Sequence, residues 1–354
     1  METGTSGGKV WHMRVLVTGG AGFIGSHFVR SLVGGRYPGF PRARVTVLDK
    51  LTYAGNRASL EPLLSSGRVE LVVGDILDRG LVDTLMAATD LVVHFAAESH
   101  VDRSIAGAAD FAVTNVVGTQ SLLDSALRAG PKDLRFVHVS TDEVYGSIET
   151  GSWPETAVLE PNSPYSASKA GSDLMARAYA RTHGLDVLVT RCSNNYGPYQ
   201  FPEKVIPLFI TNLLQGRKVP LYGDGLNVRD WLHVDDHCRA IALVAQKGRS
   251  GETYNIGGGT ELSNRELTGL LLQACDADWS RVQWVPDRKG HDRRYSVDIA
   301  KSTRELGYAP QVPFGAGLAG TVDWYRENPQ WWGGLLHPRR PADPSTTLVR
   351  SRNV

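Results

Sequence analysis

The sequence has few cysteines, no long apolar run and almost no excess of charge. Its 354 residues include three cysteines, Cys192, Cys238 and Cys275, without the spacing of a metal site. That scarcity excludes a disulfide framework and a cysteine-based zinc site, so we expect no metal and a cytoplasmic location. No apolar run approaches the ~18 residues of a membrane span. A net charge of +1 offers no attracting field to nucleic acid or to a charged membrane surface.

The two ends of the chain differ in composition from the part between them. Residues 1–12 are rich in glycine, serine and threonine and lack the apolar core of a signal peptide, so we expect a flexible leader. Residues 333–354 carry prolines and arginines and are expected to form a loose tail. The remaining length, with 42% hydrophobic residues overall, predicts one large domain or two modest ones.

Short apolar runs alternate with amphipathic stretches in the first half of the chain. Continuous β-branched runs are typical of parallel strands covered on both faces. The expected strands are residues 14–18, 44–48, 69–73, 91–96, 135–140 and 187–190, and the expected helices are residues 23–33, 81–88, 101–129 and 164–183. This alternation predicts an α/β fold with a doubly wound parallel sheet. After Arg191, prolines and glycines predict a smaller mixed C-terminal lobe, with Thr253–Ile256 returning to the sheet.

A glycine loop follows the first expected strand. Gly19, Gly22 and Gly25 would form a tight turn and let the next helix direct its N-terminal amides at a pyrophosphate. Asp49 ends the second strand 24 residues after Gly25, close to the spacing of ~20 at which an acid binds the hydroxyls of a ribose. Because a carboxylate repels a 2′-phosphate, this favours NAD over NADP, although the adjacent Lys50 weakens the preference. The alternative is a structural turn with an unrelated surface aspartate.

Tyr165 and Lys169 lie four residues apart at the start of an expected helix and so share one face of it. Such a pair is usually part of a solvated surface. Behind a nucleotide loop, however, the ammonium and a cationic nicotinamide ring would favour the phenolate. A phenol pKa lowered from ~10 by about 3 units would give a base for a hydroxyl that loses hydride. Thr141 ends the fifth strand and would hydrogen-bond the same hydroxyl.

Two carboxyls, Asp142 and Glu143, follow Thr141 at the same strand end. Two carboxyls whose pKa values are pushed apart provide one proton donor and one proton acceptor. On spacing alone, solvated loop acids are the plainer interpretation. The sequence around them decides between these readings.

Together these motifs resemble the extended short-chain dehydrogenase/reductase family, and the string TDEVYG at 141–146 resembles the active-site motif of its dTDP-glucose 4,6-dehydratases. Further strings similar to that family are DKLTYAGN at 49–56, ESHVDRSI at 98–105, SNNYGPYQFPEK at 193–204, NVRDW at 227–231 and GHDRRY at 290–295. Lys289 departs from the family, which usually has proline there, and would loosen that loop.

The resemblance implies a domain organisation and an assembly. Residues 13–193 would form a Rossmann-type NAD-binding domain, with some later segments threading back into it. Residues 194–332 would form a nucleotide-sugar-binding lobe. A homodimer would be joined through parts of 101–129 and 164–183.

The resemblance also implies a reaction, the conversion of dTDP-glucose to dTDP-4-keto-6-deoxyglucose and water with NAD held throughout. Tyr165, with Lys169 and Thr141, would take the proton of the 4-hydroxyl as hydride leaves C4. Glu143 would then remove the C5 proton, and Asp142 would protonate the departing 6-hydroxyl. Hydride would finally return to C6.

The same resemblance, together with strand-end positions, gives two sets of binding residues. The cofactor set is Gly19, Gly22, Phe23, Ile24, Gly25, Asp49, Lys50, Leu51, Thr52, Asp75, Ile76, Ala96, Ala97, Ser99, Thr114, Ser140, Tyr165, Lys169 and Asn195. The substrate set is Ser99, Thr141, Asn194, Lys204, Val205, Pro220, Tyr222, Arg229, Asn264, His291 and Tyr295. Arg229 is the first candidate for the diphosphate, because a guanidinium binds it in bidentate fashion.

Two other functions stay open at this point. Another nucleotide-sugar enzyme, such as a 4-epimerase or a dehydratase of a UDP- or GDP-sugar, would keep Tyr165 and Lys169 but has no evident use for both Asp142 and Glu143. A catalytically silent NAD-binding sensor would have no need of an intact Thr141, Tyr165 and Lys169. The sequence does not separate a thymine from a uracil nucleotide.

Overall fold

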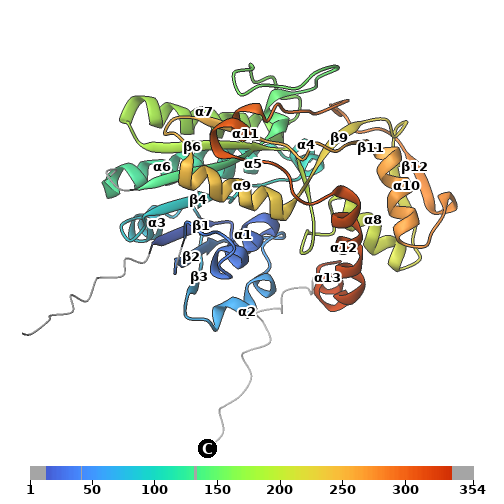
Figure 1. Ribbon diagram of the computed structural model, residues 1–354, viewed down its shortest axis with the longest axis horizontal. Helices are drawn as coiled ribbons and strands as arrows, with labels where there is room; N and C mark the ends of the chain where they lie inside the picture. Colours follow the sequence, from blue (N-terminus) through green and yellow to red (C-terminus); the bar gives the residue numbers. More distant parts are fainter. Residues whose placement is uncertain (1–12, 41, 131–133, 337–354) are drawn as a thin grey trace, which may run out of the picture.

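A computed structural model describes residues 13–40, 42–130 and 134–336. The expected leader, residues 1–12, lies outside the described residues. Figure 1 shows a layered α/β body next to a smaller lobe, which contains helices α8, α10, α12 and α13. Within the described ranges, no helix is both long and apolar enough to cross a membrane.

The body is built on a seven-stranded sheet whose strands are all parallel, as expected for a Rossmann-type doubly wound fold. In spatial order its strands are β10 (Thr253–Ile256), β6 (Asp186–Cys192), β5 (Arg135–Thr141), β4 (Leu91–His94), β1 (Arg14–Thr18), β2 (Arg44–Asp49) and β3 (Val69–Val73). The strand order reverses next to β1, and such a switch point leaves a crevice at the carboxyl ends of the strands.

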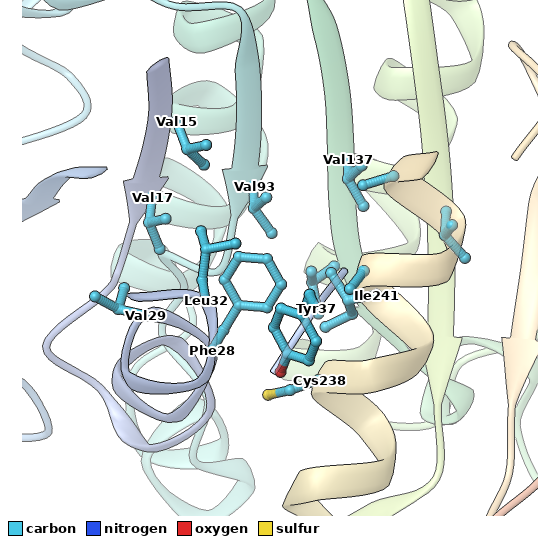
Figure 2. Close-up of a cluster of buried hydrophobic side chains, with 14 of the residues drawn as sticks. Val15, Val17, Phe28, Val29, Leu32, Tyr37, Val93, Val137, Cys238 and Ile241 are labelled. Carbon is cyan, nitrogen blue, oxygen red and sulfur yellow. The ribbon is translucent and has the colours of Figure 1, made fainter. Parts of the chain in front are cut away.

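Helices cover both faces of the sheet. Because side chains alternate along a strand, Val15 and Val17 of β1 enter one apolar core while Leu16 enters the other. The first core is covered by α1 (Phe23–Val33), α9 (Val234–Lys247) and α11 (Ala300–Leu306); the second by α3 (Arg79–Met86), α6 (Gly118–Ala129) and α7 (Pro164–His183). Figure 2 shows Phe28 of α1 and Ile241 of α9 lying over the strands in the first core.

Helix α7 carries the expected Tyr165–Lys169 pair and has strong signals at both ends. Ser163 caps it, because its hydroxyl accepts from the Ser166 amide while the Ser166 hydroxyl accepts from the Ser163 amide. Pro164 occupies the first turn, where its missing amide hydrogen costs nothing. Gly184 ends the helix in the left-handed region, with φ of 67°. These local signals fix where the helix begins and therefore which way Tyr165 points.

The expected helix over 101–129 is not continuous. It is divided into α4 (Val101–Ala106), α5 (Ala109–Phe111), a π-helical turn η2 (Ala112–Val117) and α6. Gly107 is extended and ends α4. The Asn115 side chain, in the π-helical turn, accepts a hydrogen bond from the Glu98 amide and donates to the Glu98 carbonyl. It also donates to the Ser168 hydroxyl. These contacts between distant segments override the local helical pattern.

Several other boundaries differ from expectation by one or two residues; β6 extends to Cys192 rather than ending at residue 190, and α3 ends at Met86 rather than at residue 88. Strand β4 ends at His94 rather than at residue 96, because the chain then turns along the edge of the glycine loop. Helix α3 begins at Arg79 rather than at residue 81, because the Asp78 carboxylate caps it by accepting from the Leu81 amide.

The smaller lobe has its own apolar core and two small sheets. Its strands are β7 (Asn194–Tyr196), β9 (Val228–His233) and β11 (Glu261–Ser263) in one sheet, and β8 (Val219–Tyr222) and β12 (Val282–Val285) in the other. Its helices are α8 (Val205–Leu214), α10 (Asn264–Ala274), α12 (Phe314–Glu327) and α13 (Pro329–Leu336). The remaining short elements are η1 (Arg57–Ser59), α2 (Glu61–Leu64), η3 (Asp142–Tyr145) and η4 (Trp279–Arg281).

The expected tail is partly helical. Residues 333–336 complete α13, which is held by the buried Trp332, whose indole Nε1 donates to the Tyr325 carbonyl at 2.8 Å. The tail therefore starts later than the composition predicts. Residues 337–354 lie outside the described residues.

Candidate active site

Two adjoining cavities lie at the carboxyl ends of the sheet strands. The first, of about 360 Å³, is lined by the glycine loop, Asp49, Thr141, Tyr165 and Lys169. The second, of about 180 Å³, faces the smaller lobe. Side chains that line both cavities mark their boundary, and they are Glu143, Asn194, Glu203, Lys204, Val205 and Trp231.

The glycine loop packs so tightly against neighbouring backbone that Gly19 and Gly25 leave no room for a side chain. Gly19 has φ of 69°, and a Cβ there would lie 2.5 Å from the backbone nitrogen of Ala96. A Cβ on Gly25 would lie 2.4 Å from the Gly19 carbonyl oxygen. Helix α1 begins after Gly22 with no side-chain cap, so its first amides are available to an anion. The loop therefore fits the pyrophosphate of a dinucleotide.

Asp49 is held rigidly at the end of β2. Its carboxylate accepts from the amides of Ala21, at 2.9 Å, and Leu51, at 2.8 Å. Lys50, which weakened the preference for NAD, forms an ion pair with Asp75 at 2.6 Å. Its charge is thus engaged beside the ribose position rather than directed at a 2′-phosphate, and the site fits NAD.

All but one of the expected cofactor residues line the first cavity. The exception is Leu51, whose backbone is left-handed, with φ of 52°, and whose side chain packs against the first apolar core. Its amide acts indirectly by holding Asp49. The expected substrate residues all line one cavity or the other.

Tyr165 and Lys169 are buried side by side on one face of α7. Lys169 Nζ donates to the Val139 carbonyl at 2.8 Å, and burial lowers the pKa of Lys169 to about 8. Burial raises the pKa of Tyr165 well above its ordinary value, and Glu143 adds to this effect. Desolvation and nearby carboxylates therefore oppose the expected lowering, which also depends on a cationic nicotinamide ring and stays a prediction.

The two carboxyls after Thr141 have different surroundings. Asp142 is 2% exposed; the Thr141 hydroxyl donates to its Oδ1 at 3.2 Å, and burial raises its pKa well above the ordinary value. Burial also raises the pKa of Glu143, but Lys204 and Arg229 oppose that shift. The pair is therefore suited to one protonated and one ionised carboxyl, and neither is a solvated loop acid.

The second cavity presents cations and aromatic rings. Arg229 donates to the carbonyls of Val228, at 2.7 Å, and Asp292, at 2.9 Å, and its guanidinium lies 4.3 Å from the centre of the Tyr295 ring. These contacts use part of its donor set and fix its plane. Lys204 enters from the boundary. A nucleoside diphosphate is the kind of ligand that such a surface accepts.

Sequence reasoning missed four charged residues that line the second cavity, Asp102, Glu203, Arg288 and Asp292. Arg288 lines the second cavity, forms an ion pair with Asp102 at 2.6 Å and lies over the Tyr222 ring. Glu203 lines both cavities and pairs with Arg103 at 3.1 Å. Glu203 stands within the recognised 193–204 string and Arg288 shortly before the 290–295 string, so their positions were the available signal. Lys289 is exposed and lines neither cavity.

Comparisons with known proteins agree with this geometry. Residues 16–321 match the family described as GDP-mannose 4,6 dehydratase. A dTDP-glucose 4,6-dehydratase of Streptomyces antibioticus is 62% identical over 334 residues, covering 94% of this chain and 98% of that protein. One from Actinoplanes is 61% identical, covering 90% of this chain and 100% of that protein.

Solved structures give the same result. DesIV, a dTDP-glucose 4,6-dehydratase of Streptomyces venezuelae solved with NAD and dTDP bound, is 66% identical, with a TM-score of 0.90 over 91% of this chain and 100% of that chain. A UDP-glucose 4-epimerase of Thermotoga maritima is 34% identical, with a TM-score of 0.81 over 89% of this chain and 99% of that chain. The resemblance inferred from the motifs is confirmed: the chain belongs to the dTDP-glucose 4,6-dehydratase family.

Proposed function

We propose that Thr141, Asp142, Glu143, Tyr165 and Lys169 divide the chemistry of dTDP-glucose dehydration among them. The enzyme is an NAD-dependent hydro-lyase, which converts dTDP-glucose to dTDP-4-keto-6-deoxyglucose and water. NAD, when bound, supplies the hydride chemistry, taking hydride from C4 and returning it to C6. The protein must supply the proton transfers and hold the sugar between the cavities.

Tyr165 removes the proton of the sugar 4-hydroxyl. Because burial raises the pKa of Tyr165, the ammonium of Lys169 is needed to stabilise the phenolate in a site where water does not. Thr141, at the end of β5, faces the phenol and hydrogen-bonds the same substrate hydroxyl. General base catalysis of this kind contributes typically ~10²–10⁴-fold to the rate.

Glu143 removes the C5 proton and Asp142 protonates the departing 6-hydroxyl. The observation that carries this assignment is that Glu143 lines both cavities whereas Asp142 lines the first alone. Glu143 thus stands where the cofactor cleft meets the substrate cavity, and Lys204 favours its ionised form. The buried Asp142 keeps its proton and can donate it.

The nucleotide of the substrate occupies the second cavity. Arg229, Lys204, Asn194 and His291 surround the position of the diphosphate, and Pro220, Tyr222 and Asn264 line the part that would hold the nucleoside. The cofactor residues of the first cavity hold NAD, with the glycine loop at its pyrophosphate and Asp49 at its ribose.

The test is incubation of the purified protein with dTDP-glucose, followed by the alkali-induced absorbance of a 4-keto sugar. With dTDP-glucose we expect this absorbance to appear. A weaker absorbance with UDP-glucose would show a preference for the thymine nucleotide. An epimerase would instead yield dTDP-galactose and no lasting keto sugar. A silent sensor would yield neither product.

We further propose a cytoplasmic homodimer without a nucleic-acid partner. Val113 and Val117 of η2 and Leu174 of α7 are 44%, 49% and 54% exposed on two helices that pack together. A second copy would cover these apolar side chains. Three unpaired cysteines support the reducing compartment, and the net charge of +1 gives no attraction for nucleic acid. Leu174→Asp should lower the molar mass measured in solution by half.

A further inference from the structure

A chain of buried polar side chains continues from Lys169 into the protein, outside both cavities. Asp173, His138 and Arg191 have 0% exposed side chains. Asp173 Oδ2 accepts from Arg191 Nε at 2.8 Å, and Asp173 Oδ1 lies 3.3 Å from His138 Nε2. Arg191 Nη1 also contacts the Tyr145 hydroxyl at 2.7 Å. This chain joins α7, β5, β6 and the segment that carries the two active-site carboxyls.

The charges in this chain are placed where they act on Lys169. Asp173 follows Lys169 by four residues on α7, so both lie on the same face of the helix. Lys169 and Arg191 are two buried cations, and Asp173 is paired with Arg191. Asp173 itself raises the pKa of Lys169, because an anion on the interior side of the lysine favours its ammonium form.

The other titratable groups that face Lys169 supply no compensating charge from the interior side. Burial lowers the pKa of His138, on β5, to about 4, and lowers the pKa of His94, on β4, well below its ordinary value, so both are neutral. Burial raises the pKa of the Cys192 thiol, on β6, so it is uncharged. Tyr165, Asp142 and Glu143 lie on the substrate side. Asp173 is therefore the interior anion for this lysine.

We propose that Asp173, held in place by its buried pair with Arg191, is a positioning residue that keeps Lys169 protonated beside Tyr165. This rests on the proposed role of Lys169 as the cation that stabilises the phenolate. Asp173 touches neither cavity and takes no part in the reaction itself. It sets the pH range over which the Tyr165–Lys169 pair has one negative and one positive charge.

The direction of each charge change can be stated. Asp173→Asn removes an anion, which favours the deprotonated forms of both Tyr165 and Lys169 and lowers both pKa values. The acid limb of kcat/KM, set by Tyr165, and the alkaline limb, set by Lys169, should both move to lower pH by roughly one unit. Arg191→Gln removes a cation and should move both limbs to higher pH. The double variant, which removes both charges, should return the limbs close to their wild-type positions.

The experiment measures kcat/KM for dTDP-glucose against pH in the three variants and in Asp173→Glu, which should restore the wild-type limbs. Asp186→Asn is the matched control, because Asp186 pairs with Arg135 of β5 at 2.8 Å near the start of β6, whereas Arg191 lies near the end of that strand. Its limbs should not move. A slower Asp173→Asn enzyme with unmoved limbs would overturn the proposal, because a purely structural role affects the rate without shifting both pKa values.

A second measurement does not depend on turnover. The tyrosinate absorbance of each variant, minus that of its Tyr165→Phe counterpart, follows the ionisation of Tyr165 alone and should shift in the same directions. Asp173→Asn leaves Arg191 unpaired and is the least stable variant. If it does not fold, the other two variants still test the proposal. Arg191→Gln should shift the titration to higher pH, and the double variant should leave it close to that of the wild type. If wild-type protein forms no 4-keto sugar, the proposed function fails while this titration still decides the role of Asp173.

Discussion

Lys204 Nζ donates a hydrogen bond to the backbone carbonyl of Ser99 at 2.7 Å, which joins the smaller lobe to the loop after β4. The same side chain lines both cavities. Burial raises the pKa of Glu143, and Lys204 opposes that shift more than any other neighbour does. One ammonium therefore ties the two lobes together and keeps the proposed C5 base ionised.

Replacing Lys204 by Met should move the acid limb of C5 proton removal to higher pH. Without the ammonium, the pKa of Glu143 rises further, so the carboxylate forms only at a higher pH. We expect a shift of roughly one unit, measured as deuterium incorporation at C5 against pH. Lys289→Met, in an exposed turn outside both cavities, should leave the limb in place. A raised KM with an unmoved limb would restrict Lys204 to substrate binding.

The glycine loop should tolerate no side chain at Gly25. In Gly25→Ala the new Cβ would meet the Gly19 carbonyl oxygen at 2.4 Å, so the turn that holds the pyrophosphate must open. We expect loss of bound NAD on purification and at least a tenfold weaker affinity for NAD, on the order of 1.4 kcal/mol in binding. Gly320→Ala, where a new Cβ meets nothing within 4 Å, is the control and should retain both. Equal NAD content in the two variants would count against this reading of the loop.

Much of the body could be predicted because its signals are local. Gly19–Gly25 and Ser163–Pro164 specify a turn and a helix start from neighbouring residues alone. The break between α4 and α6 could not, because Asn115 reaches Glu98 and Ser168, which are distant in sequence. The pairing of Asp173 with Arg191 likewise joins a helix to a strand, and no spacing rule reveals it.

The position of the catalytic groups was more predictable than their ionisation. The order of residues along β5 and α7 places Thr141, Tyr165 and Lys169 at one cavity. Their pKa values depend on burial, which a sequence does not measure. The phenol of Tyr165 was therefore expected to have a lowered pKa. Desolvation raises that pKa instead, so the lowering is left to Lys169 and to the cationic nicotinamide ring.

NAD should remain with the enzyme through turnover. Each cycle oxidises C4 and reduces C6, so the cofactor ends as it began. The purified protein should carry NAD, and product should form without stoichiometric consumption of added NAD, measured by quantifying both. Consumption of one NAD for each product molecule would indicate a simple dehydrogenase instead.

Lys169→Met should move the acid limb of the pH–rate profile to higher pH and slow C4 oxidation. Loss of the ammonium raises the pKa of Tyr165, so the phenolate forms only at higher pH. The alkaline limb, which we assign to loss of the Lys169 ammonium, should disappear. The rate should fall by roughly 10²-fold or more. A profile identical to that of the wild type would make Lys169 a bystander.

Variants of the two carboxyls should separate oxidation from elimination. C4 oxidation requires Tyr165, Lys169, Thr141 and NAD, whereas elimination also requires Glu143 and Asp142. Glu143→Gln keeps the shape of the side chain and removes the base, so C5 proton loss should stop while oxidation persists. Asp142→Asn removes the proton donor, so loss of the 6-hydroxyl should slow while oxidation again survives. Each change should reduce turnover by about 10²–10⁴-fold.

A single-turnover experiment can tell these roles apart, because each step leaves its own signal. Absorbance of the reduced cofactor reports oxidation at C4, and solvent deuterium at C5 reports action of the base. Both variants should accumulate the reduced cofactor, but the C5 label should be suppressed in Glu143→Gln alone. The isosteric amides keep the packing around η3, so a loss restricted to one signal reflects the proton transfer rather than the fold. Dehydration at the wild-type rate in either variant would remove that carboxyl from the mechanism and would favour an epimerase-like site.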